Sequence, residues 1–196
     1  MLSLLLPLIY LAFISLGLPD SLLGAAWPLM VVELDAPLSA AGMVSMTICA
    51  STIVSSLLSD RMTRRFGTGL VTAASVALTA AALFGFSQAK ALWMLFVFAV
   101  PYGLGAGGVD AALNNYVALH YASRHMSWLH CFWGVGASIG PYIMGWALTA
   151  GHGWRTGYGT VCLIQVCLML VLFAALPLCL FAWWLCFLRK KKKKRA

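Results

Sequence analysis

Charged residues are scarce in this chain, and their scarcity excludes most classes of soluble protein. Only 9% of its 196 residues are charged, five of them acids, whereas 62% are hydrophobic. A soluble domain carries roughly a quarter charged residues, so the composition predicts an integral membrane protein. The N-terminus has no basic segment ahead of its first apolar stretch. We therefore expect a retained first span and not a cleaved signal peptide.

The sequence also lacks the residue patterns of an enzyme or of a nucleic-acid-binding protein. It has no serine–histidine–aspartate set, no metal-ligand spacing and no phosphate-binding loop, so we expect no catalysis, no cofactor and no metal. The net charge of +8 is concentrated, because seven of the 13 basic residues lie in the run Arg189–Arg195. Such a tail favours anionic lipid headgroups over nucleic acid. The six cysteines all fall in apolar stretches, where we expect small buried side chains and no disulfides.

Six apolar segments are each long enough to cross a bilayer of about 30 Å. They cover residues 4–31, 39–59, 68–88, 91–118, 127–150 and 157–187. The predicted fold class is all-α integral membrane, with a six-span bundle over residues 1–188 and a basic tail over 189–196. Two similar stretches, ending at Asp20 and 90 residues later at Asp110, suggest two three-helix repeats of about 4–88 and 91–187.

Basic residues gather at one set of span ends, which predicts the orientation. That set holds Arg61, Arg64, Arg65, Arg124 and Arg189–Arg195, whereas the opposite set holds only Lys90 and Arg155. The positive-inside rule then places both termini in the cytoplasm of a multi-pass protein of the cell membrane.

Asp20 and Asp110 are the strongest candidates for a functional site, because each lies inside an apolar span. A carboxylate in hydrocarbon costs about 2.5 kcal/mol or more on insertion scales, and such acids usually face a cavity. There they bind a solute or carry a proton. Asn114 lies four residues after Asp110, on the same helical face, and offers an amide to the same solute. For Gly103 and Gly107 on that face, helix packing is the favoured interpretation.

Other residues in the first and fifth spans allow two readings each. Trp27 shares a face with Asp20, and either stacks on a solute or anchors the span at the interface, the anchor being favoured. His130 titrates near neutral pH and is either a solute ligand or an ordinary packing residue. Gly136, Gly140 and Pro141 predict a closely packed, bent helix that is able to gate.

The predicted loop between the second and third spans, residues 60–67, has an unusual charge order. Asp60 begins it directly at the end of a span, and Arg61, Arg64 and Arg65 follow. An acid in that place can lie near the N-terminus of a neighbouring helix and pair with an arginine. We interpret the four residues as a latch that holds the helices in one of two states.

These residues resemble the major facilitator superfamily. The signature of that family between its second and third helices is a glycine, three residues, then Asp-Arg-x-Gly-Arg-Arg. Here the acid and the three arginines match, while Ser56 and Thr63 replace the two glycines. The run from Leu129 to Pro141, and the Gly-x-Pro-Asp that ends at Asp20, are similar to fucose-permease-like bacterial members. In those members an asparagine often occupies the position of Ser127.

The resemblance implies a secondary transporter that moves a small polar solute, such as a sugar, by proton-coupled symport and alternating access. Asp20 matches the acid that carries the coupling proton in such members. Members of the family normally have twelve spans in two halves. This chain is therefore expected either to form a homodimer or to lack its second half because the reading frame of its gene ends early. Two alternatives remain: a non-transporting membrane fragment or assembly subunit, and an efflux protein for drugs or cations.

Overall fold

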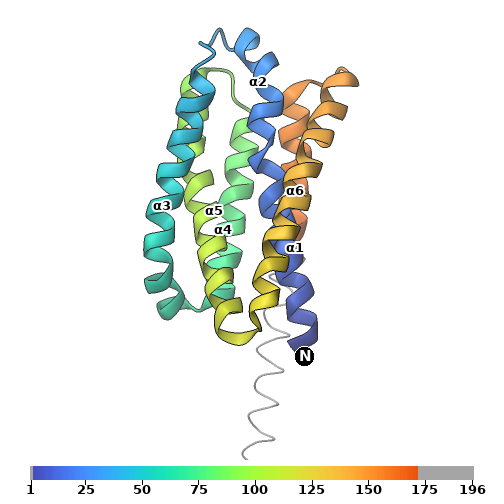
Figure 1. The fold of residues 1–196 in the computed structure, drawn as a ribbon. Helices are drawn as coiled ribbons and strands as arrows, with labels where there is room; N and C mark the ends of the chain where they lie inside the picture. Colours follow the sequence, from blue (N-terminus) through green and yellow to red (C-terminus); the bar gives the residue numbers. More distant parts are fainter. Residues whose placement is uncertain (1, 172–196) are drawn as a thin grey trace, which may run out of the picture.

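Long helices run side by side, up and down the bundle, through the described part of the chain (Figure 1). The computed structural model describes residues 2–171. Its helices are α1 (Leu2–Asp20), α2 (Leu22–Glu33), α3 (Ala40–Phe66), α4 (Thr68–Ser87), α5 (Leu92–His120) and α6 (Ser123–Thr149), followed by the helix Gly153–Val171. The predicted tail, and the last half of the sixth predicted span, lie outside the described residues.

Five segments of the described chain are long and apolar enough to cross a membrane. They are Leu5–Glu33, Ala40–Phe66, Thr68–Ser87, Leu92–His120 and Gly153–Val171. The 27-residue α6 is not among them, because histidines, serines and glycines dilute its apolar residues. It nevertheless runs alongside α1 for most of the length of the bundle (Figure 1). The chain is therefore a multi-pass membrane protein, and the fifth predicted span, residues 127–150 in α6, stays a prediction.

The first predicted span is two helices, with a break at Ser21 directly after Asp20. Pro19 lies in the last turn of α1 and has no N–H, so the carbonyl of Ser15 loses its helical donor. Gln165 replaces that donor from the helix Gly153–Val171, with its Nε2 2.6 Å from the Ser15 oxygen. The Ser15 hydroxyl donates in return to Gln165 Oε1 at 2.9 Å. Because hydrocarbon offers no partner for a free carbonyl, this pair makes the interrupted helix tolerable.

The second predicted span is longer than expected, and the predicted loop at residues 60–67 is wrong. α3 continues through Phe66, and Gly67, with φ of 82°, is the only residue between it and α4. The charged residues that suggested a loop belong to the last turns of α3. Asp60 and Arg64 are four residues apart and form an ion pair of 2.7 Å, which stabilises the helix. A glycine at this corner avoids the steric penalty of a left-handed backbone.

The helices form two closely packed groups, α1 with α6 and α5 with α3 and α4. Small residues lie at the crossings: a Cβ on Gly136 would overlap the Ile14 carbonyl of α1, and one on Gly140 would overlap that of Leu18. In the other group, Gly103 and Gly107 of α5 meet the α3 backbone in the same way. Close backbone approach of this kind is typical of helices that associate in lipid. The hydrophobic effect does not drive their association there, and van der Waals packing between small residues does.

Polar contacts join the two groups at the end of the bundle opposite the N-terminus. Glu33, the last residue of α2, accepts hydrogen bonds from the Trp154 indole and the Arg155 guanidinium. Arg155 also donates to the Ala89 carbonyl, 2.9 Å away in the α4–α5 connection, and lies over the Trp154 ring. The end of α2 is thus held by residues that are distant in the sequence.

Two neighbouring glycines of α6 test the packing. We expect Gly136→Ala to lower the melting temperature of the detergent-purified protein by several degrees, because overpacking a close crossing costs about 1–3 kcal/mol. Gly134→Ala is the matched control: nothing lies within 4 Å of the added Cβ, and alanine favours a helix over glycine by about 1 kcal/mol. Equal melting temperatures for the two variants would contradict the close crossing of α1 and α6.

Candidate functional site

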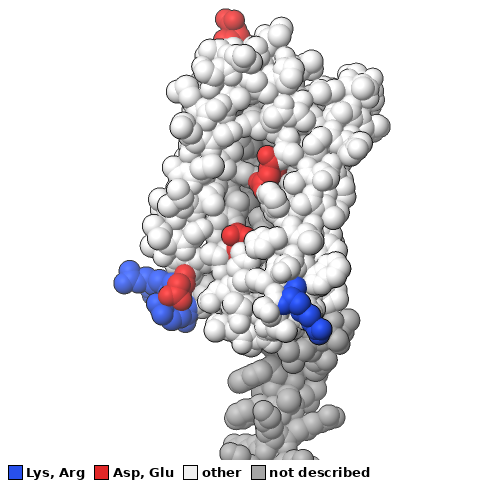
Figure 2. Space-filling view, in the orientation of Figure 1, with Lys and Arg blue, Asp and Glu red and all other residues white. Residues whose placement is uncertain are grey.

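A cavity of about 840 Å³ lies between the two helix groups. It is lined by residues of every helix described, including the α1–α2 break, one side of α3 and the middle of α5. Figure 2 shows the hollow on this face of the molecule, with two acidic patches inside it and the basic side chains of this face near the lower end. The cavity lining includes both Asp20 and Asp110. The structure therefore brings the two intramembrane acids to one space.

Asp20 is the junction of three helices. It ends α1, and its Oδ1 accepts a hydrogen bond of 2.6 Å from the Tyr102 hydroxyl of α5. Its Oδ2 accepts one of 2.9 Å from the Trp133 indole of α6. The carboxylate is nevertheless exposed to the cavity. Asp20 therefore joins α1 to α5 and α6 beside the cavity.

Asp110 lies in the same cavity, with a simpler set of contacts. Asn114 Nδ2 donates to Asp110 Oδ1 at 3.0 Å, as expected for two residues one helical turn apart. Asn114 also has a buried Oδ1 that accepts no hydrogen bond from the described residues. The cavity lining therefore holds two acids, Asp20 and Asp110.

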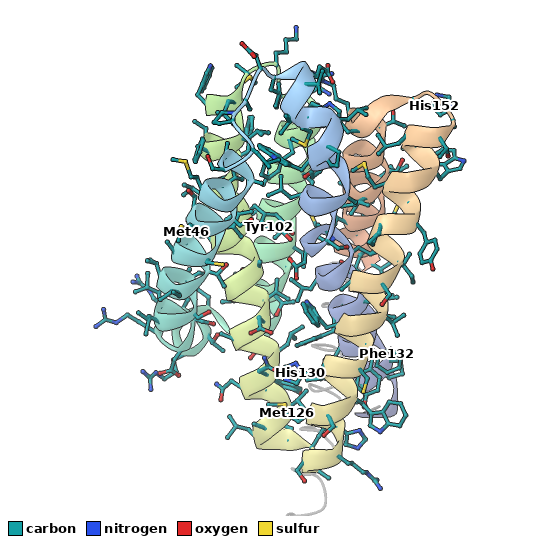
Figure 3. The ribbon with its side chains drawn as sticks, turned by 45° about the horizontal axis from the view of Figure 1, so that its top comes forward. Met46, Tyr102, Met126, His130, Phe132 and His152 are labelled. Carbon is teal, nitrogen blue, oxygen red and sulfur yellow. The ribbon has the colours of Figure 1, made fainter. Side chains whose placement is uncertain are left out.

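His130 is an exposed residue of α6, and its ring meets the edge of Phe13 from α1 at 6.3 Å between centroids. Figure 3 shows it nearer the end with the basic residues than Tyr102 is. It is not part of the cavity lining. Its role as a solute ligand stays a prediction.

Trp27 is not brought to the cavity. It is 5% exposed, lies among the core residues of α2 and donates from its indole to the Leu38 carbonyl at 3.2 Å. The structure thus places it neither on a solute nor in the open as an interfacial anchor. It fastens α2 to the connection before α3.

The predicted latch residues are far from the cavity lining, at the α3 end where basic side chains gather. Asp60 pairs with Arg64 of its own helix, and both side chains are exposed. The structure shows no hydrogen bond from Asp60 to a neighbouring helix within residues 2–171. The latch role of Asp60, Arg61, Arg64 and Arg65 remains a prediction. Gly136 and Gly140 lie at the α1 crossing, and α6 continues through Pro141.

Sequence reasoning missed the partners of Asp20. Tyr102 lies eight residues before Asp110, which is about two helical turns on the same face, and this spacing was a usable signal. Trp133 and Gln165 carry a weaker signal, since each is a polar-tipped side chain in an apolar stretch. The cysteines were expected to be buried, but of the four that the structure describes only Cys162 is buried. Cys49, Cys131 and Cys167 are exposed, and Cys49 lines the cavity. No three His, Cys, Asp or Glu side chains of the described residues could together hold a metal ion.

Comparison with known proteins agrees with this arrangement. The family model described as Major Facilitator Superfamily matches residues 9–196, nearly the whole chain. No curated protein matches the chain.

Cys49 provides a direct probe of the cavity and its charge. In a variant that keeps only Cys49, we expect reaction with water-soluble methanethiosulfonates, and a several-fold preference for the trimethylammonium-ethyl reagent over the sulfonatoethyl reagent. Each rate is divided by that of a free thiol, so that the ratio reports the field of Asp20 and Asp110. A variant that keeps only Cys162, which is 9% exposed, is the control and should react slowly. A normalised ratio of one would contradict a negative cavity.

Proposed function

Because the chain belongs to the major facilitator superfamily, whose members are membrane transporters, we propose that it acts in secondary transport and that its solute binds around Asp20 and Asp110. The observation that carries this proposal is the exposure of two intramembrane carboxylates to one cavity. A purely structural bundle gains nothing from two like charges in such a place. The same observation disfavours the alternative of an assembly subunit without transport.

Asp20 is the proposed proton site. Its two oxygens hold Tyr102 of α5 and Trp133 of α6, and both hydrogen bonds are strongest when the acceptor is charged. Protonation weakens at least one of them, and so loosens α1 from a neighbouring helix. A change of charge is thereby converted into a change of helix packing, which proton-coupled symport by alternating access requires.

We also propose that the two three-helix repeats exist. The first helix of each proposed repeat packs on the middle helix of the other, α1 on α6 and α5 on α3. Gly17 lies three residues before Asp20 and meets α6, and Gly107 lies three residues before Asp110 and meets α3. The solute would then bind between two related units, with the basic end of the bundle in the cytoplasm of a cell-membrane protein. The fucose-permease-like subgroup rests on the sequence motifs.

Uptake into proteoliposomes under an imposed proton gradient tests the function. We expect wild-type protein to accumulate a solute, and Asp20→Asn and Asp110→Asn to reduce the initial rate at least tenfold, since neither amide can carry the proton or the charge. Asp35→Asn is the matched control. It removes an exposed acid outside the cavity lining, at a φ of 47° that asparagine accepts. Correctly inserted wild type without uptake of any solute screened would favour the non-transporting alternative.

A second unit is proposed to cover the open cavity, either another copy of this chain or a separate second half. Exposed apolar side chains such as Ile53 of α3 and Tyr142 of α6 leave a surface suited to such contact. We expect light scattering of the detergent-purified chain to give the mass of a homodimer. A monodisperse, thermally stable monomer would contradict self-association.

A further inference from the structure

We propose that the solute is an organic cation with an apolar body, and not a sugar or an anion. This inference rests on the proposed function, since it names the class of molecule that the same cavity takes. Two features of the cavity carry it: the sign of its charge and its aromatic wall.

The charge of the lining has one sign. Asp20 and Asp110 are both present, and no lysine or arginine is among the lining residues. The basic residues that the structure describes lie at or beyond the ends of their helices. Two carboxylates that repel one another across a shared space are stabilised when a positive charge enters between them. An anionic solute has the same sign of charge as the two carboxylates and is therefore repelled from the cavity.

Aromatic side chains form one wall beside Asp20. Phe86 stacks on Tyr158 at 5.4 Å between ring centroids and meets Tyr102 edge-on at 6.3 Å. Trp133 is 42% exposed and lines the same cavity. Its indole N–H donates to Asp20, so the ring lies beside the carboxylate. A cation over an indole face, next to a carboxylate, is attracted by both groups.

The donors that flank Asp20 are occupied. The Tyr102 hydroxyl and the Trp133 indole both donate to Asp20, whereas the Ser21 hydroxyl of the same lining has no hydrogen-bond partner among the described residues. A sugar needs donors for its oxygens as well as acceptors for its hydroxyls, and unmatched polar groups reduce its binding. A cation with an apolar body needs only the acceptors and the aromatic faces. The volume of about 840 Å³ leaves room for that body.

The two acids then have different tasks. Asp20 is held by donors from two other helices, whereas the protein donor to Asp110 in the described structure is Asn114 of its own helix, on Oδ1. The second oxygen of Asp110 is thus left for the positive group of the solute. Asp110 is the solute-binding acid and Asp20 the acid tied to helix packing.

Equilibrium binding of radiolabelled tetraphenylphosphonium to the detergent-purified full chain tests this assignment. We expect saturable binding that benzyltrimethylammonium displaces, and that neither its uncharged isostere neopentylbenzene nor D-glucose displaces. Asp110→Asn should weaken binding about tenfold or more. Asp35→Asn should bind as the wild type does, and the melting temperature of each variant confirms that it is folded.

Each other outcome overturns the proposal. Equal displacement by neopentylbenzene would show that apolar area alone drives binding, and displacement by D-glucose would show a sugar site. Unchanged binding by folded Asp110→Asn, or no binding by folded wild type, would remove the cation site. Uptake measurements separate this proposal from the proposed function. Binding of the cation without any uptake would contradict the transport function but not the cation site. Proton-driven uptake of glucose would contradict the cation as solute but not the transport function.

Discussion

Every polar group within the membrane must find its partner inside the protein, and the bundle depends on how this requirement is met at the α1–α2 break. Pro19 removes one backbone donor, and the Gln165 amide replaces it at the Ser15 carbonyl. That exchange ties the first helix to the last one described, across 150 residues of sequence. It satisfies the carbonyl that Pro19 leaves without a donor, just before Asp20 in the sequence.

Asp20, the cavity and the candidate site lie together at the end of α1. The Asp20 carboxylate accepts hydrogen bonds from Tyr102 and Trp133 and stays open to the cavity. Glycine crossings on either side hold α1 against α6 and α5 against α3. The space between these two rigid pairs is the natural place for a solute, since motion of one pair against the other changes access to it.

The two acids are in unequal surroundings, and this inequality is informative. Like charges in one cavity disfavour each other's ionisation, so a compensating positive charge or a proton is required near them. Both oxygens of Asp20 accept hydrogen bonds from protein donors, whereas one oxygen of Asp110 has no protein donor among the described residues and is available to a solute. One carboxylate can then respond to the proton and the other to the solute, which is the division of labour that coupled transport needs.

The sequence alone determined the membrane environment, most helix positions and the two acids, because composition, apolar length and the penalty for buried charge are local properties. The prediction of a loop at residues 60–67 was wrong, because a cluster of charged residues is found both in loops and at the ends of helices. The Asp60–Arg64 ion pair at helical spacing shows that here it belongs to a helix. The sequence also left Trp27 beside Asp20 on a helical face, where the structure buries it against Leu38. Only the tertiary structure decided which distant side chains meet Asp20 and Ser15. Those contacts join residues 82 to 150 positions apart, and no periodicity within one helix specifies the partner on another.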